Sequence, residues 1–111
     1  MGDGDPAELP PLPEHVELVL DVVDAIPEGC ALAYGDVARL VGRGGPRQVG
    51  KVMAHYGSLT CWWRVIRADG RPPPGHEREA LAQYRREGTP LRGERVDLAR
   101  ARPPDPTARP V

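Results

Sequence analysis

The chain contains no phenylalanine and no run of about 18 apolar residues, the length that a membrane-spanning helix requires. Its N-terminus also lacks the basic and apolar regions of a signal peptide. We therefore expect a cytoplasmic protein that has no membrane partner. The only two tryptophans, Trp62 and Trp63, are adjacent, within the stretch TCWWRVIRADG at residues 60–70.

Cysteine is scarce as well. Cys30 and Cys61, taken together with the three histidines, show no spacing that is typical of metal ligands. In a reducing compartment two such thiols are expected to be free rather than joined in a disulfide. We predict neither a metal site nor a cofactor.

Positive charge is missing from residues 1–38, which contain nine acidic residues and no lysine or arginine. Residues 39–67 contain no acidic residue, and their basic residues are Arg39, Arg43, Arg47, Lys51, Arg64 and Arg67. This segregation predicts a positive face, of the kind that binds nucleic acid, on a chain whose formal net charge is -1. A solvated basic surface is the alternative, and the charges alone do not separate the two.

The 14 prolines and 13 glycines are concentrated at the two ends of the chain and in a few internal breaks. This distribution predicts disordered tails at residues 1–13 and 103–111 around one domain at residues 14–102. A single domain of this size has a modest core.

The spacing of apolar residues predicts a helix over residues 14–26, followed by a short extended piece at residues 30–32. A second helix is expected to begin near Tyr34, and a third to run from Pro46, which suits a first helical turn, to about His55. Because a glycine-containing turn separates the second and third helices, they form a predicted helix-turn-helix whose later helix is the recognition helix.

The remaining segments predict a strand at residues 63–66, a tight turn at residues 68–70 and an irregular return at residues 71–75, which together would form a wing. A fourth helix is expected from Glu77 to Glu87 and ends at Gly88. Val96 and Leu98 indicate a last short strand. The expected fold class is mainly α with short strands, a winged helix-turn-helix DNA-binding domain.

Four phrases, IPEGCALAYGDVARLVG, PRQVGKVM, WWRVIRADG and REGTPLRGERVDL, make the chain resemble the DNA-binding domain of the O6-alkylguanine-DNA alkyltransferases. In catalytic members of that family the residues before RVI are proline, cysteine, histidine and arginine, and the cysteine accepts the alkyl group. With RVI in register, Trp62 stands at the cysteine position and Trp63 at the histidine position. The chain therefore resembles the non-enzymatic, alkyltransferase-like branch, in which tryptophan commonly replaces the cysteine.

Alkyl transfer to sulfur needs a thiolate and a neighbouring base, and indole supplies neither. We predict that the protein is not an enzyme and has no catalytic residue. A shifted nucleophile at Cys61 is the alternative, although in an extended segment Cys61 would point away from the face of Trp62. Trp63 is left with two possible roles, stacking in the pocket or bracing the wing.

The resemblance also implies the residues of a DNA site. The lesion pocket is expected to consist of Trp62, Tyr34, Val65, Pro74, Gly75 and His76, with Arg78 as a weaker candidate. Arg47 and Tyr34 are expected to flip the nucleotide, Arg47 filling the space that it leaves, although Tyr34 also reads as an ordinary half-buried tyrosine. The expected contacts to the DNA backbone are Gly50, Lys51, Arg43 and Arg64. The shortness of the segment HYGSLT leaves the positions of Tyr56 and Ser58 undecided.

The function that the resemblance implies is recognition of DNA damage. We expect a monomer that binds O6-alkylguanine in double-stranded DNA through the minor groove, flips the nucleotide and flags the lesion for nucleotide excision repair, whose proteins are further expected partners. Two other functions stay open at this point. They are residual alkyl transfer by Cys61 and sequence-specific binding as a winged-helix transcription regulator.

Overall fold

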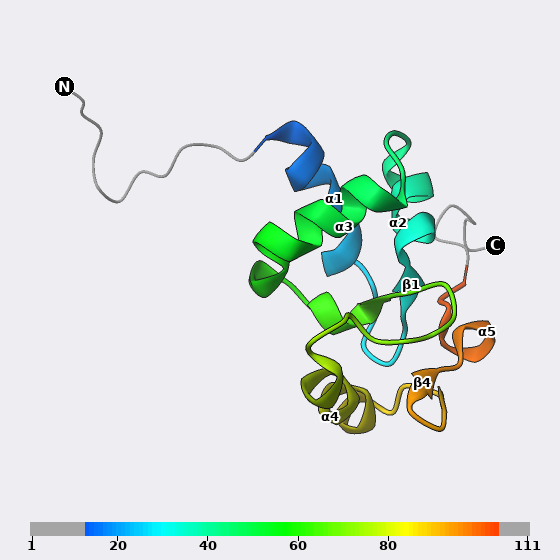
Figure 1. Ribbon diagram of the computed structural model, residues 1–111. Coiled ribbons are helices and arrows are strands. Elements are labelled where there is room, and N and C mark those ends of the chain that lie inside the picture. Colours follow the sequence, from blue (N-terminus) through cyan, green and yellow to red (C-terminus); the bar gives the residue numbers. More distant parts are fainter. Residues whose placement is uncertain (1–12, 105–111) are drawn as a thin grey trace.

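The computed structural model describes residues 13–104, so the two predicted tails lie almost entirely outside the described residues (Figure 1). Within this range the predicted fold class is confirmed, because helices dominate and each described strand has two residues. The wing is less regular than a strand pair, as described below.

Three helices form the first half of the domain and lie together in the upper part of Figure 1. They are α1 (Glu14–Asp24), α2 (Tyr34–Val41) and α3 (Pro46–Tyr56). The predicted helix over residues 14–26 therefore ends two residues early, whereas the other two have almost the predicted bounds. Pro46 opens α3, where its missing N–H is not needed, and the backbone N–H of Gly45 donates to the Gln48 side chain at 2.8 Å. The helix-turn-helix is present.

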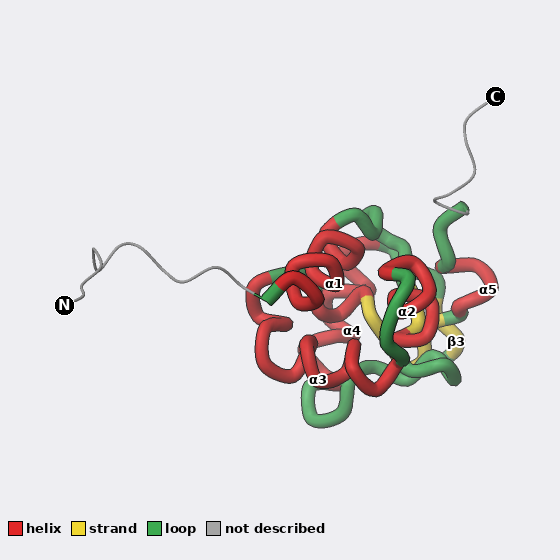
Figure 2. Tube along the Cα trace, turned by 90° about the horizontal axis from the view of Figure 1, so that it is seen from above, coloured by secondary structure: helices red, strands yellow, loops and turns green. Residues whose placement is uncertain are grey.

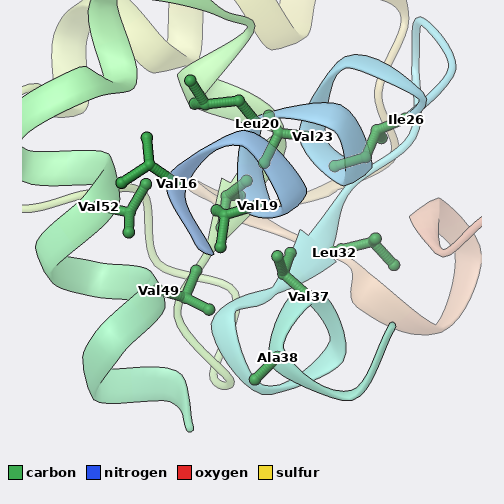
Figure 3. Packing of buried hydrophobic residues seen from close by; sticks show 11 residues of the cluster. Val16, Val19, Leu20, Val23, Ile26, Leu32, Val37, Ala38, Val49 and Val52 are labelled. Carbon is green, nitrogen blue, oxygen red and sulfur yellow. The ribbon is translucent and has the colours of Figure 1, made fainter. Parts of the chain in front are cut away.

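Aliphatic side chains, mostly valine and leucine, fill the space between these helices in a chain that has no phenylalanine (Figure 3). The buried members of this first cluster are Val16, Val19, Leu20, Val23, Ile26, Leu32, Val37, Ala38, Val49, Val52 and Val65. Burial of a valine or leucine side chain contributes about 1.5–3 kcal/mol, so this cluster fixes α3 against α1 and α2.

A short parallel ladder joins the two halves of the domain. Strand β1 (Leu32–Ala33) pairs with β2 (Val65–Ile66), so that Leu32 lies opposite Val65 and Ala33 opposite Ile66. Successive residues of a strand point to opposite faces. Val65 accordingly belongs to the first cluster and Ile66 to a second one.

The second half contains α4 (Glu77–Glu87), the antiparallel pair β3 (Leu91–Arg92) and β4 (Arg95–Val96), and α5 (Leu98–Ala101). Helix α4 has the predicted bounds, and Gly88 ends it in the left-handed conformation at φ +75° that glycine adopts readily. Seen from above in Figure 2, β3 and α5 lie to the right of α1 and α3. The second cluster consists of Ala31, Ile66, Ala80, Leu81, Tyr84, Val96 and Ala101.

The predicted last strand is correct at Val96 and wrong at Leu98. The Asp97 carbonyl accepts hydrogen bonds from the backbone N–H groups of Arg100 and Ala101, at 3.0 and 2.8 Å. A helical turn therefore begins at Leu98, and the side chain of Leu98 packs against the second cluster from α5.

The predicted strand at residues 63–66 is shorter than expected, because only Val65 and Ile66 are extended. Before it, η1 (Gly57–Leu59) and η2 (Trp62–Arg64) form 3-10 turns. The predicted tight turn is confirmed by the hydrogen bond from Gly70 N to Arg67 O at 2.9 Å. The return over residues 71–75 is irregular, as predicted, so the wing is a loop rather than a strand pair.

Candidate nucleic-acid interface

A pocket of about 750 Å³ opens between α3 and the loop that precedes α4. One side consists of α3 and η1, and the opposite side of η2, the irregular loop and the first turn of α4. The helical side contributes Gly50, Met53, Ala54, His55, Gly57 and Ser58, and the other side Trp62, Pro73, Pro74, His76 and Glu79. Tyr34 and Arg67 complete the lining. The volume is within the range of about 300–1,000 Å³ that is usual for small-molecule sites.

Four of the predicted pocket residues, Tyr34, Trp62, Pro74 and His76, do line this pocket. They come from α2, η2 and the loop before α4, so the fold brings together segments that are distant in the sequence. Their contact with a lesion stays a prediction.

Two predicted pocket residues lie elsewhere. Val65 is 0% exposed, because its strand pairing with Leu32 turns the side chain into the first cluster. Gly75 borders a neighbouring, shallower cleft together with Arg78. Neither residue is part of the pocket wall, and the prediction is corrected for both.

The ring of Trp62 has two aromatic neighbours. Its centroid lies 5.6 Å from that of His76 and 5.8 Å from that of Trp63, in each case in an edge-on arrangement. Edge-to-face pairs at this distance contribute about 0.5–1.5 kcal/mol beyond the burial of area. His76 and Trp63 therefore both help to hold the Trp62 ring at the pocket.

Trp63 does not line the pocket and faces the C-terminal end of α4 instead. Its indole Nε1–H donates to Glu87 Oε1 at 3.0 Å, and its backbone carbonyl accepts from the Tyr84 hydroxyl at 2.6 Å. The Arg64 guanidinium carbon lies 5.7 Å from the Trp63 ring centroid. Of the two roles left open for Trp63, stacking in the pocket is not favoured, and the bracing contacts go to α4 rather than to the wing.

Arg64 is committed to the same carboxylate. Its guanidinium contacts Glu87 Oε1 at 2.5 Å and also donates to the carbonyl oxygen of Ile26 at 2.9 Å. The side chains of Arg64 and Glu87 are 12% and 1% exposed. Arg64 thus links η2 to α4 and to the end of α1, and its contact with the DNA backbone stays a prediction that these intramolecular contacts do not favour.

Glu87 is the centre of this cluster. Its other carboxylate oxygen accepts the backbone N–H of Gly29 at 3.2 Å. Burial alone would raise the pKa of Glu87, but the hydrogen bonds from Arg64, Gly29 and Trp63 outweigh it, and the pKa lies below its ordinary value. The carboxylate is therefore charged at neutral pH, and both of its oxygens accept hydrogen bonds from groups of the same domain.

Cys61 is a partly buried free thiol that precedes η2 and does not line the pocket. The facing argument from the sequence assumed an extended segment, and that assumption is wrong because Trp62 begins a 3-10 turn. Trp62 nevertheless lines the pocket without Cys61. Cys30, the other free thiol, packs against the first cluster.

The predicted backbone-binding cations lie on and before α3. Arg47 and Lys51 are exposed and one helical turn apart, so they share a face with Gly50 and Ala54, which line the pocket. Arg43 precedes α3 and forms an ion pair with Glu14, in which the two side chains are 54% and 75% exposed. Exposed ion pairs contribute only about 0–1 kcal/mol to stability, so this pair leaves Arg43 free to contact another anion.

The family of the chain follows from a comparison with known proteins. The model of the 6-O-methylguanine DNA methyltransferase DNA-binding domain matches residues 14–94. The chain belongs to this family. The matched range contains the helix-turn-helix, the pocket and the Glu87 cluster.

Similar proteins indicate to which branch of the methyltransferase family the chain belongs. The DNA base-flipping proteins of Escherichia coli (strain K12) and Shigella flexneri are each 39% identical to this chain over 93 residues, covering 76% of it and 70% of their own length. The crystal structure of S. pombe Atl1 in complex with damaged DNA containing O6-carboxymethylguanine shares 28% identity, with a TM-score of 0.71 over 83% of this chain and 96% of that one. A complex of S. pombe ATL with DNA has a TM-score of 0.69. These relatives place the chain among the alkyltransferase-like proteins.

Several features of this alkyltransferase-like domain were missed from the sequence. Glu87 had no signal, because its partners are 23 and 24 residues away along the chain. Arg67, Glu79 and the α3 residues from Met53 to His55 were not assigned to the pocket, although helical spacing from Gly50 places Ala54 on its face. Of the two undecided residues, Ser58 lines the pocket and Tyr56 packs against the first cluster.

Two further findings concern the described part of the methyltransferase-family domain. Within residues 13–104, no group of three or more histidine, cysteine, aspartate or glutamate side chains is arranged to hold a metal ion. None of the helices in that range is both long enough and apolar enough to cross a bilayer.

Proposed function

We propose that this alkyltransferase-like protein binds O6-alkylguanine in duplex DNA, flips the nucleotide out of the helix through the minor groove and does not transfer the alkyl group. The observation that carries the proposal is a pocket lined by Trp62 and bordered by α3, on which Arg47 and Lys51 are exposed. Similarity to proteins described as base-flipping, and to one crystallised with damaged DNA, supports it.

Trp62 is suited to hold a flipped base rather than to react with it. An indole has no nucleophilic sulfur, and stacking of a base on an aromatic ring contributes about 1–3 kcal/mol. His76 contacts the Trp62 ring edge-on, and Met53 and Pro73 add apolar surface to the pocket. An apolar lining of this kind accommodates alkyl groups of several sizes.

Helix α3 is suited to approach the sugar-phosphate backbone. A side chain added at Gly50 would meet no atom within 4 Å, so glycine leaves open space at this point of the helix. Arg47 would enter the base stack, Tyr34 would help to rotate the nucleotide, and Lys51 and Arg43 would contact phosphates. Because phosphate contacts release counterions, binding should weaken steeply as salt is raised.

A protein that recognises a lesion without chemistry requires another activity to remove it. We therefore extend the proposal to recruitment of nucleotide excision repair proteins by the bound complex. In this role the protein would act as a monomer, in the cytoplasm and on the nucleoid when bound to DNA.

The proposed function is tested by the affinity for two duplexes that differ only in one O6-methyl group. Fluorescence anisotropy at fixed salt should show tighter binding of the methylated duplex by about tenfold or more, since a damaged base costs less to unpair and flip than normal guanine. Equal affinities would reject lesion recognition. A preferred undamaged sequence would instead favour the transcription regulator.

Alkyl transfer is tested separately by intact-protein mass spectrometry after incubation with the O6-methylguanine duplex. We expect an unchanged protein mass, because neither Trp62 nor Trp63 can act as nucleophile or base. A gain of one methyl group that disappears in Cys61→Ser would establish residual transfer by Cys61 and reject the non-enzymatic proposal.

A further inference from the structure

Arg67 places a positive charge at the pocket for which the described residues supply no counter-ion. It follows β2 directly, is partly buried and lines the pocket that contains Trp62. Among residues 13–104, no carboxylate lies within ion-pair distance of its guanidinium. Arg64, three residues earlier, differs in this respect, because its guanidinium forms an ion pair with Glu87.

Three of the acidic side chains near Arg67 contact other groups. Asp69 pairs with Arg71 at 3.4 Å, Glu79 contacts His76 Nδ1 at 3.3 Å, and Glu77 accepts the backbone N–H of Gly75 at 3.1 Å. Glu94 is exposed and borders the same small cleft as Arg67, and Glu79 lines the pocket itself. No described ion pair therefore holds the Arg67 guanidinium at the pocket, although the carboxylates of Asp69, Glu77 and Glu79 lie in its surroundings. The charge of Arg67 also acts on Tyr34, another residue of the pocket lining. Burial raises the pKa of the Tyr34 hydroxyl, and the positive charge of Arg67 partly opposes that rise.

We propose that Arg67 is a specificity-determining residue, which makes the pocket prefer O6 substituents that end in a carboxylate over neutral substituents of the same shape. The inference rests on the proposed function, because it assumes that the flipped guanine enters this pocket. A guanidinium can hold a carboxylate through two parallel hydrogen bonds, which are stronger than neutral ones. The apolar lining of Trp62, Met53 and Pro73 would contact either substituent equally.

A neighbouring arginine outside the pocket provides a control for the loss of charge. Arg67 also borders a smaller cleft, of about 400 Å³, that contains Arg71 and Arg95, and neither of these two arginines lines the pocket. Arg95→Gln removes one positive charge from that neighbouring surface without altering the pocket wall. It reports what a loss of charge alone does to DNA binding.

The experiment compares duplexes that contain guanine, O6-methylguanine, O6-carboxymethylguanine or O6-carbamoylmethylguanine at one position of the same sequence. The last two substituents differ only in a carboxylate against a neutral amide. Wild type should bind the carboxymethyl duplex about tenfold more tightly than the amide, because hydrogen bonds in which the groups are charged are stronger than those between neutral groups. Arg67→Met should reduce this ratio to one or below, and Arg95→Gln should leave it unchanged.

The outcomes separate this inference from the function on which it rests. If every modified duplex binds no better than guanine, the proposed function fails and the inference with it. If O6-methylguanine is preferred over guanine but the carboxymethyl to amide ratio is one, or survives Arg67→Met, the inference alone is overturned. An equal loss of affinity for all four duplexes in Arg67→Met would assign Arg67 to a phosphate contact and would also overturn it.

Discussion

Arg47→Ala should lower the affinity for an O6-methylguanine duplex by about tenfold to a hundredfold, because a flipped nucleotide leaves an unstacked gap that costs a few kcal/mol to hold open. Arg47 is exposed in the first turn of α3, on the face that leads to the pocket. Fluorescence anisotropy measures the loss. Thermal unfolding should be nearly unchanged, since an exposed side chain away from caps and networks contributes little to stability.

Lys51→Ala is the matched control, since Lys51 is also exposed and lies one turn further along α3. A phosphate contact should strengthen the binding of damaged and undamaged duplexes alike, and its removal should reduce the salt dependence of both. Arg47→Ala should instead reduce the ratio between the two affinities. If both variants lose the two affinities equally, Arg47 is only a phosphate contact.

Glu87→Ala should lower the free energy of unfolding by about 3–5 kcal/mol, the usual cost of removing one partner of a buried ion pair. The Glu87 carboxylate is buried and holds Arg64, Trp63 and the backbone of Gly29. Its loss would leave a buried guanidinium without a counter-ion. Urea unfolding measures the change, with Glu14→Ala as control, because the exposed Glu14–Arg43 pair should contribute no more than about 1 kcal/mol.

The Glu87 carboxylate should make the free energy of unfolding fall as the pH is lowered. Because the pKa of Glu87 is lowered by folding, its contribution is complete above its unfolded pKa of about 4.3 and is lost as pH falls below that value through the folded pKa. Stability of the wild type should therefore decline below about pH 4 more steeply than that of Glu87→Gln. Parallel curves would show that Glu87 is not held as a charged group.

The elements that the sequence predicts well are those with local signals at their ends. Helix α3 begins at Pro46, and α4 ends at Gly88, so their bounds follow from proline and glycine geometry. The apolar spacing of α1 indicates its buried face correctly, including Val16, Val19 and Val23. Such signals act over a few residues and need no knowledge of the fold.

The conformation of residues 62–64 has no local signal. Trp63 and Arg64 both reach Glu87, whereas neighbouring residues of a strand would point to opposite faces. The 3-10 turn is thus determined by a carboxylate 23 residues beyond Arg64. The assignment of Val65 to the pocket is wrong because the register with Leu32, a residue distant in the sequence, turns its side chain into the first cluster.

The candidate site was predictable where it depends on the family resemblance and not where it depends on the particular side chains of this chain. Tyr34, Trp62 and His76 were placed in one pocket by alignment, and the structure brings them together. Arg67 was visible in the sequence only as one of several cations. Its distinction is that, in the described part of the chain, it lines the pocket without forming an ion pair, which is a property of three-dimensional arrangement.

The hydrogen bond between Trp63 and Glu87 bears on how such a protein could evolve. Indole Nε1–H is a donor and has no acceptor nitrogen, so Trp63 cannot pass a proton between position 62 and Glu87 as an imidazole could. A single change of Trp62 to cysteine would supply a thiol without a relay. Chemistry at position 62 that needs a proton acceptor at position 63 would therefore require a second substitution, at Trp63, besides Trp62→Cys.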